Sequence, residues 1–229
     1  MEQLWNFGDQ RQVAWCAYCG RGTSTRDHVP SKVLLDKPYP ENLPVVPACR
    51  DCNEGLSIDE EYVACLMECA TTGSAFPSDV WRPKVQRILS EKPALAARLA
   101  ASREQIAETT QFSIEGDRVK RVLLKLGRGH ALFELNEPQF TEPSNLVYVP
   151  LPSLPRDIRT RFEELPEPSV WPEVGSRAMQ RLVEAGDLSR EWIVVQPSRY
   201  RYVAFAESTI VVRIVLSEYL GCEVVWGEN

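Results

Sequence analysis

The sequence of 229 residues contains only two histidines, His28 and His130, and it has no excess of positive charge. Its 26 Lys and Arg residues stand against 32 Asp and Glu residues, and this net charge of −6 argues against a protein that coats nucleic acid by bulk charge. No apolar run approaches the roughly 20 residues that cross a bilayer, so no contact with a membrane is expected. The first residues lack the basic and apolar regions of a signal peptide, which predicts a cytoplasmic protein.

Cysteine, in contrast, is present seven times, an odd number that does not suggest a disulfide framework in a chain without a secretion signal. Four cysteines form two C-x-x-C pairs, separated by 29 residues: Cys16 and Cys19, then Cys49 and Cys52. Two such pairs can place four thiolates around one structural Zn²⁺. A redox-active C-x-x-C is the alternative, but it needs only one pair and a βαβ context. The other three lie in apolar segments and are expected in the core: Cys65, Cys69 and Cys222.

Composition divides the chain into three segments and predicts an α+β fold. Residues 1–75 are rich in proline and hold the paired cysteines, and Ser57 opens a helix that ends near Gly73. Residues 76–135 are predicted to be mostly helical, with helices from Ser78 to about Leu89, from Pro93 to Ala107 and from Gly116 onwards. Residues 136–229 are first rich in proline and then β-rich. The strands expected there are 191–196, 199–206, 209–216 and 222–226, after a short helix at 177–185.

The net charge is unevenly distributed over these segments, which carry −5, +4 and −5. The positive charge concentrates in the helix expected after Gly116: Arg118, Lys120, Arg121, Lys125 and Arg128. This basic face is expected either to contact phosphates or to be an ordinary solvated helix face. His130 lies on the apolar stripe of the same helix, so we expect a packed, hydrogen-bonded histidine.

The residues between the cysteine pairs include a dipeptide with catalytic chemistry, Asp27-His28. Asn42 follows fourteen residues after His28, and Asn53 directly follows Cys52. Imidazole suits a general base at neutral pH, and carboxylate and amide oxygens suit a hard cation such as Mg²⁺. The set therefore indicates metal-assisted phosphodiester hydrolysis, and a structural histidine beside a zinc site is the alternative.

These motifs together resemble the HNH endonuclease family. The similar strings are Cys16-x-x-Cys19, Asp27-His28-Val29-Pro30-x-Lys32, Asn42-Leu43 and Cys52-Asn53-x-x-x-Ser57-x-Asp59-Glu60-Glu61-Tyr62, within residues 13–72. The resemblance implies an N-terminal zinc-stapled ββα-metal (HNH) module. A helical middle and a C-terminal antiparallel β-rich region would follow it.

By position in the family motif, the resemblance implies that His28 is the general base and that Asn42 holds the histidine loop. It also implies that Asp27 and Asn53 bind a catalytic Mg²⁺ or Mn²⁺ ion, and that the four paired cysteines bind structural zinc. One departure is that the Lys often found shortly after the last motif residue is absent, since Glu54-Gly55-Leu56 stands there.

The expected function is therefore a metal-dependent endonuclease that hydrolyses phosphodiester bonds of nucleic acid, with DNA ranked before RNA. The alternative is a non-catalytic zinc-binding module for nucleic-acid or protein interaction, in which Asp27 and His28 are structural. Residues 136–229 match no motif, and we expect them to serve target choice, regulation or assembly, through a second copy of the chain or a regulatory partner.

Overall fold

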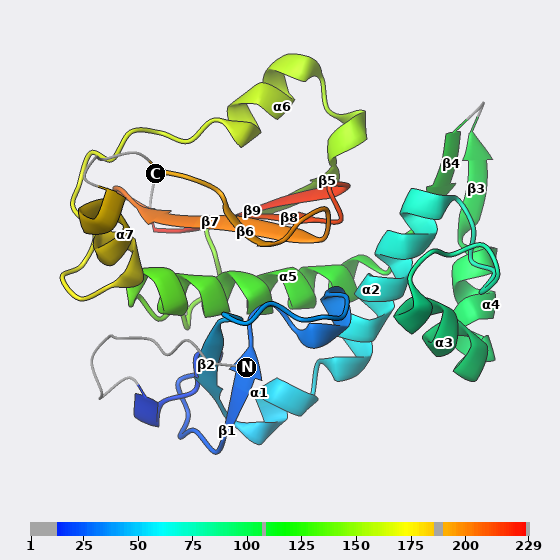
Figure 1. Cartoon of the computed structure of the whole chain (residues 1–229), viewed down its shortest axis with the longest axis horizontal. Helices are drawn as coiled ribbons and strands as arrows, with labels where there is room; N and C mark the ends of the chain where they lie inside the picture. The colour runs from blue at the N-terminus through cyan, green and yellow to red at the C-terminus, as the bar shows by residue number, and fades with distance from the viewer. Residues whose placement is uncertain (1–12, 107–108, 186–189, 228–229) are drawn as a thin grey trace.

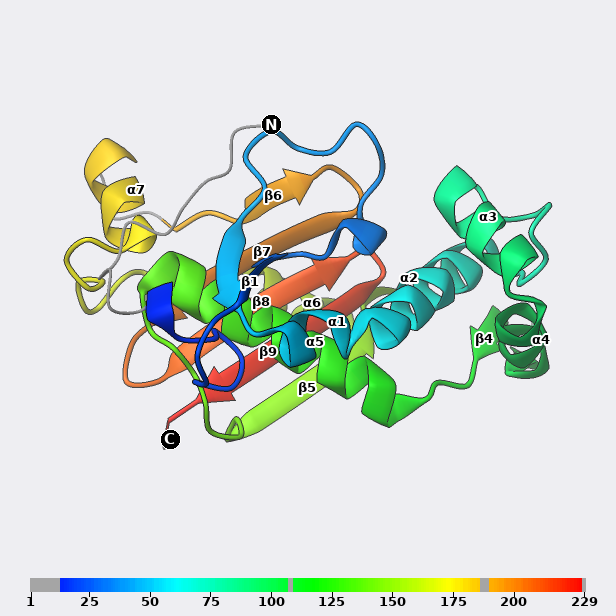
Figure 2. The same ribbon diagram turned by 90° about the horizontal axis from the view of Figure 1, so that it is seen from below.

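The fold is arranged around helix α5 (Gly116–His130), which lies between an N-terminal hairpin and a C-terminal sheet (Figure 1). The structure is a computed structural model, and it describes residues 13–106, 109–185 and 190–227. Seen from below, the hairpin and the first helices lie over α5, and α5 crosses the face of the sheet (Figure 2). The α+β fold class and the β-rich C-terminal region are confirmed.

The N-terminal segment forms an antiparallel hairpin followed by two helices. Strand β1 (Thr25–His28) pairs with β2 (Val45–Ala48), and their long connection contains the 3-10 helix η2 (Lys32–Leu34). Helices α1 (Arg50–Glu54) and α2 (Ser57–Thr72) follow. Helix α2 begins at Ser57 as predicted, but its N-cap is Leu56, so the expected cap by the Ser57 side chain is wrong. It ends at Gly73, whose φ of 72° lies in the left-handed region that glycine enters without strain.

The middle segment is less helical than predicted. Helices α3 (Pro83–Glu91) and α4 (Pro93–Ala101) each begin at a proline, whose fixed φ suits a first turn. The predicted helix from Ser78 was wrong in its start, and the Ala-rich helix ends at Ala101 instead of Ala107. The chain then turns into strand β3 (Arg103–Ile106), which pairs with β4 (Thr109–Phe112). After Ala101 the residues no longer form an apolar stripe that would pack a helix against the core. Without that packing, pairing as a strand is favoured over a longer helix.

The C-terminal segment is a five-stranded antiparallel sheet with the order β5-β9-β8-β7-β6. Its strands are β5 (Asn145–Pro150), β6 (Ile193–Gln196), β7 (Tyr200–Ala206), β8 (Ile210–Leu216) and β9 (Leu220–Trp226). The connections contain η4 (Leu151–Ser153), α6 (Arg156–Glu163) and α7 (Arg177–Ala185). The four predicted strands and the helix at 177–185 are confirmed, whereas β5 and α6 were not predicted.

Helix α5 is clamped from both sides, and two glycines permit the close approach. A Cβ atom at Gly127 would lie 3.1 Å from the Trp226 ring, and one at Gly129 would lie 2.7 Å from a methyl group of Val29. The helix passes through both glycines and continues as the π-helix η3 (Ala131–Leu135). One buried apolar cluster extends from Cys16 to Trp226, so the hairpin, α5 and the sheet share a core. Within the described residues, no helix combines the length and apolarity needed to span a membrane.

Candidate functional site

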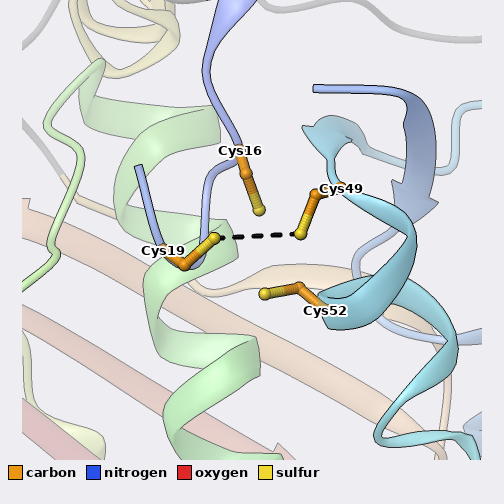
Figure 3. Close-up of side chains that lie close together, drawn as sticks. All are labelled: Cys16, Cys19, Cys49 and Cys52. Carbon is orange, nitrogen blue, oxygen red and sulfur yellow. Dashed lines mark hydrogen bonds between the residues drawn. The ribbon is translucent and has the colours of Figure 1, made fainter. Parts of the chain in front are cut away.

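The four paired cysteines converge on one point, as Figure 3 shows. Their sulfur atoms all lie within 4.8 Å of one another, and the Sγ atoms of Cys19 and Cys49 are 3.8 Å apart. Two thiolates that bind the same zinc at about 2.3 Å in tetrahedral geometry stand about 3.8 Å apart. The predicted four-cysteine cluster is therefore confirmed, and its donor set and spacing fit zinc.

Local backbone structure brings the two cysteine pairs together. After Cys16 the chain reverses at Gly20, which has a φ of 68°, and the Cys16 amide donates to the Arg21 carbonyl at 2.7 Å. The Ala17 amide then donates to the Pro47 carbonyl at 2.9 Å, which fixes this turn to strand β2. The second pair starts at the N-cap of α1, so both of its sulfurs lie in the first turn of a helix. A zinc ion would clamp the turn to the helix, and its binding free energy would become folding free energy.

The thiols differ in the surroundings that set their pKa values. Burial acts to raise the pKa of Cys19, but the Arg21 side chain, which donates to its Sγ at 3.4 Å, helps to lower that pKa to about 6. Burial raises the pKa of Cys16 and of Cys52. A bound zinc ion would hold all four groups as thiolates.

Strand β1 presents the Asp27-His28 dipeptide on two different faces. Successive side chains of a strand point to opposite sides. Asp27 is buried, as is Val29, which packs against Gly129 of α5. Arg26 is exposed and His28 is half-buried on the opposite side. The structure therefore separates the two members of the dipeptide.

The carboxylate of Asp27 is enclosed in a buried polar cluster. Its Oδ2 atom lies 2.7 Å from the Lys125 ammonium and accepts a hydrogen bond from the Tyr18 hydroxyl at 3.0 Å. The same ammonium lies 2.8 Å from Glu60 Oε1. Burial would lower the pKa of Lys125, but the two carboxylates raise it, whereas burial raises the pKa of Glu60. Lys125 therefore remains charged in the interior.

This cluster does not fit a catalytic Mg²⁺ or Mn²⁺ ion bound by Asp27. The Asp27 residue is only 8% exposed, and a divalent ion at its carboxylate would stand beside the Lys125 ammonium. Two cations at such a distance repel strongly in a buried site. The open ligand position that the HNH resemblance implies for Asp27 is absent from the described arrangement.

His28 has the surroundings of a neutral imidazole. Its Nδ1 atom is buried without a hydrogen-bond partner among the described residues. Burial and the positive charge of Lys32 lower its pKa more than the Asp27 carboxylate and the Pro44 carbonyl raise it. Since the pKa falls below the ordinary 6.5, the ring is uncharged at neutral pH and can accept a proton.

The two asparagines occupy different positions. The side-chain nitrogen of Asn53 donates to Thr25 Oγ1 at 3.2 Å and to the Arg26 carbonyl at 3.0 Å, so it fixes α1 to β1. Asn42 is exposed and lies in the long connection between β1 and β2. The site thus holds Asn53 against the hairpin and leaves Asn42 outside it.

The basic residues of α5 are largely used inside the molecule. Arg118 and Arg121 both pair with Asp59, at 2.6 and 2.7 Å. Lys125 pairs with Asp27 and Glu60, and Arg128 donates to the Tyr18 carbonyl at 3.2 Å. Intramolecular acceptors therefore occupy most of the charges on this basic face, and Lys120 and Arg121 are its exposed members.

Sequence reasoning missed three members of the buried cluster: Tyr18, Glu60 and Lys125. In the sequence Glu60 appears only as part of the string that resembles the HNH family, which does not mark it for burial. A signal for Lys125 exists, because it lies three residues after Val122 and four before Gly129, beside the apolar stripe. A lysine at that spacing is a candidate for burial, but the sequence does not reveal which carboxylates face it.

Comparisons with known proteins do not assign the chain. No model of a protein family matches it, and neither a curated protein nor a solved structure matches it. Any functional assignment therefore depends on the residues and geometry described above.

Proposed function

We propose that the chain is an HNH-type endonuclease that hydrolyses phosphodiester bonds of nucleic acid, with DNA as the first candidate substrate. The observation that carries this proposal is the position of His28. It ends the first strand of a hairpin that is clamped by a four-cysteine cluster and followed directly by a helix carrying Asn53. This order of strand, strand and helix is the one that the motif resemblance implies.

In the proposed reaction, His28 is the general base. Its neutral ring removes a proton from a water molecule, whose oxygen attacks the phosphorus atom and displaces one ester oxygen. The alternation along β1 places Arg26 on the same side of the strand as His28, and Lys32 lies close enough to lower the His28 pKa. These two cations are suited to bind the phosphate group whose hydrolysis His28 would catalyse.

A second candidate function is a non-catalytic zinc module that binds nucleic acid or a protein. The burial of Asp27 in an ion pair with Lys125 favours it, because this carboxylate then acts as part of the core. In this case the cysteine cluster and the hairpin form a stable platform, and His28 has no chemical role.

Nicking of supercoiled plasmid by the zinc-loaded full-length protein separates the two candidates. Reactions would contain no added metal, Mg²⁺ or Mn²⁺, with single-stranded DNA and RNA as parallel substrates. The nuclease proposal expects cleavage that His28→Ala lowers by roughly 10²-fold or more, since a general base contributes about that factor.

The matched control is His130→Gln, which removes the other histidine at a buried position that faces the sheet. It should retain nicking, provided that zinc content and circular dichroism match those of the wild type. Equal cleavage by His28→Ala and wild type would contradict the role of His28. An inactive wild type on all three substrates would favour the zinc module.

A further inference from the structure

We propose that Lys125 is the resident cation of the Asp27 site, and that a divalent ion binds this carboxylate only when the Lys125 ammonium is removed. The inference concerns which cation neutralises Asp27. It holds whether or not the chain cleaves nucleic acid.

The Lys125 ammonium group is coordinated by oxygens from three elements. The Lys125 Nζ atom lies 2.7 Å from Asp27 Oδ2, 2.8 Å from Glu60 Oε1 and 3.5 Å from the Asn53 backbone oxygen. These oxygens come from β1, α2 and α1, so three separate elements converge on one positive charge. An ammonium has three hydrogen atoms to donate, and this set of acceptors matches that number.

The cluster around the Lys125 ammonium is buried. Lys125 and Glu60 are each 5% exposed, and Asp27 is 8% exposed. The Tyr18 ring covers another side, with its centroid 5.3 Å from the ammonium, and its hydroxyl donates to Asp27. A hydrated divalent ion has no open approach to the carboxylate while the lysine stays in place.

The charges of the cluster nearly balance. Two carboxylates and one ammonium leave the cluster with one net negative charge, which is a modest imbalance in a buried site. Without the ammonium, the two buried carboxylates would have no positive charge between them. Such an arrangement strongly favours a divalent cation, which is a hard ion suited to carboxylate oxygens.

The position of Lys125 also gives it a mechanical role. Lys125 and Gly129 are one turn apart on α5, and they contact Asp27 of β1 and Val29, which directly follows β1. The ion pair and the glycine contact together dock the strand that carries His28 onto α5. Lys125 is thus a positioning residue for this strand.

The test is a titration with Mn²⁺ of the zinc-loaded full-length protein, in which electron paramagnetic resonance measures the free ion. We expect Lys125→Met to bind Mn²⁺ at least about tenfold more tightly than the wild type, because the variant loses a positive charge at contact distance. The double variant Lys125→Met/Asp27→Asn should lose this gain.

The matched control is Lys84→Met. Lys84 donates to the Lys32 and Leu35 carbonyls at 2.5 and 2.7 Å and contacts neither Asp27 nor Glu60. It should leave Mn²⁺ binding at the wild-type level. A folded Lys125→Met protein that gains no Mn²⁺ site would overturn the proposal.

A second comparison covers the case in which Lys125→Met does not fold. In the wild-type background, Asp27→Asn should leave Mn²⁺ binding unchanged, because the ammonium already excludes the ion. If the wild type binds Mn²⁺ and Asp27→Asn removes that binding, the proposal is wrong. Neither result depends on nuclease activity, so failure here and failure of the proposed function are distinguishable.

Discussion

The two buried faces of helix α5 hold basic side chains in opposite charge states. On the face toward the hairpin, Lys125 keeps its ammonium charge between Asp27 and Glu60. On the face toward the sheet, His130 is fully buried, accepts or donates a hydrogen bond with Tyr200 at 2.7 Å and stacks on Tyr202 at 3.6 Å between centroids. Burial lowers the pKa of His130 well below its ordinary value, so this side chain is neutral.

The difference shows what decides whether a buried basic group stays charged. Carboxylates that face Lys125 compensate the loss of hydration, whereas His130 contacts a hydroxyl and an aromatic ring, which compensate less. Figure 1 shows the hairpin and α1 on one side of α5 and the five-stranded sheet on the other. The retained charge is on the hairpin side, because Lys125 pairs with Asp27, the residue before His28 on β1.

Removal of the charge on the hairpin face should have the largest effect on stability. We expect Lys125→Met to lower the free energy of unfolding of the zinc-loaded protein by about 3–5 kcal/mol, because it leaves two buried carboxylates without a partner. Urea denaturation followed by circular dichroism measures this change.

Lys84→Met is again the matched control, since it removes hydrogen bonds to neutral groups and leaves no carboxylate unpaired. Its cost should be clearly smaller. Equal losses for the two lysine variants would show that the Lys125 charge has no special role in the interior.

A methyl group added at either glycine of α5 should test how tightly each face of the helix is packed. Gly129→Ala places its Cβ 2.7 Å from Val29, and Gly127→Ala places it 3.1 Å from Trp226. Overpacking costs typically about 1–3 kcal/mol, from which the better helix propensity of alanine subtracts about 1 kcal/mol. We therefore expect Gly129→Ala to be the more destabilising of the two in thermal or urea unfolding.

The contact itself can be tested with a second substitution. Val29→Ala shortens the side chain that meets the new methyl group, so the double variant Gly129→Ala/Val29→Ala should lose less stability than the sum of the single variants. Strict additivity would mean that the strain arises elsewhere in the helix.

Local sequence signals predicted the parts of this structure that local physics controls. The two C-x-x-C pairs predicted the cysteine cluster, and the apolar spacing from Val119 to Leu126 predicted α5. The strand expected at 199–206 corresponds to β7, and both of its tyrosines are fully buried. In each case the pattern lies within one element or one turn.

The parts that the sequence did not predict depend on contacts between distant elements. Strand β3 was expected to be helix, because the Ala-rich run before it has high helix propensity and the pairing with β4 is a tertiary effect. Asp27 was expected to face an open site, because the family motif specifies its neighbours in sequence. Its actual neighbour, Lys125, comes from a helix that no local pattern connects to the hairpin.

The neutral state of His130 predicts a pH dependence on the sheet face. A histidine in the unfolded chain titrates near 6.5, whereas the folded protein takes up this proton only at much lower pH. Below about pH 6.5 the unfolded state therefore binds more protons than the folded state. The free energy of unfolding should then fall with decreasing pH by up to about 1.4 kcal/mol per pH unit. In His130→Gln this contribution is absent, while the smaller one from His28 remains in both proteins. Urea unfolding at several values between pH 7 and pH 5.5 should therefore show a steeper loss for the wild type. Parallel curves would mean that folding does not lower the pKa of His130, which would contradict a neutral histidine on the sheet face of α5.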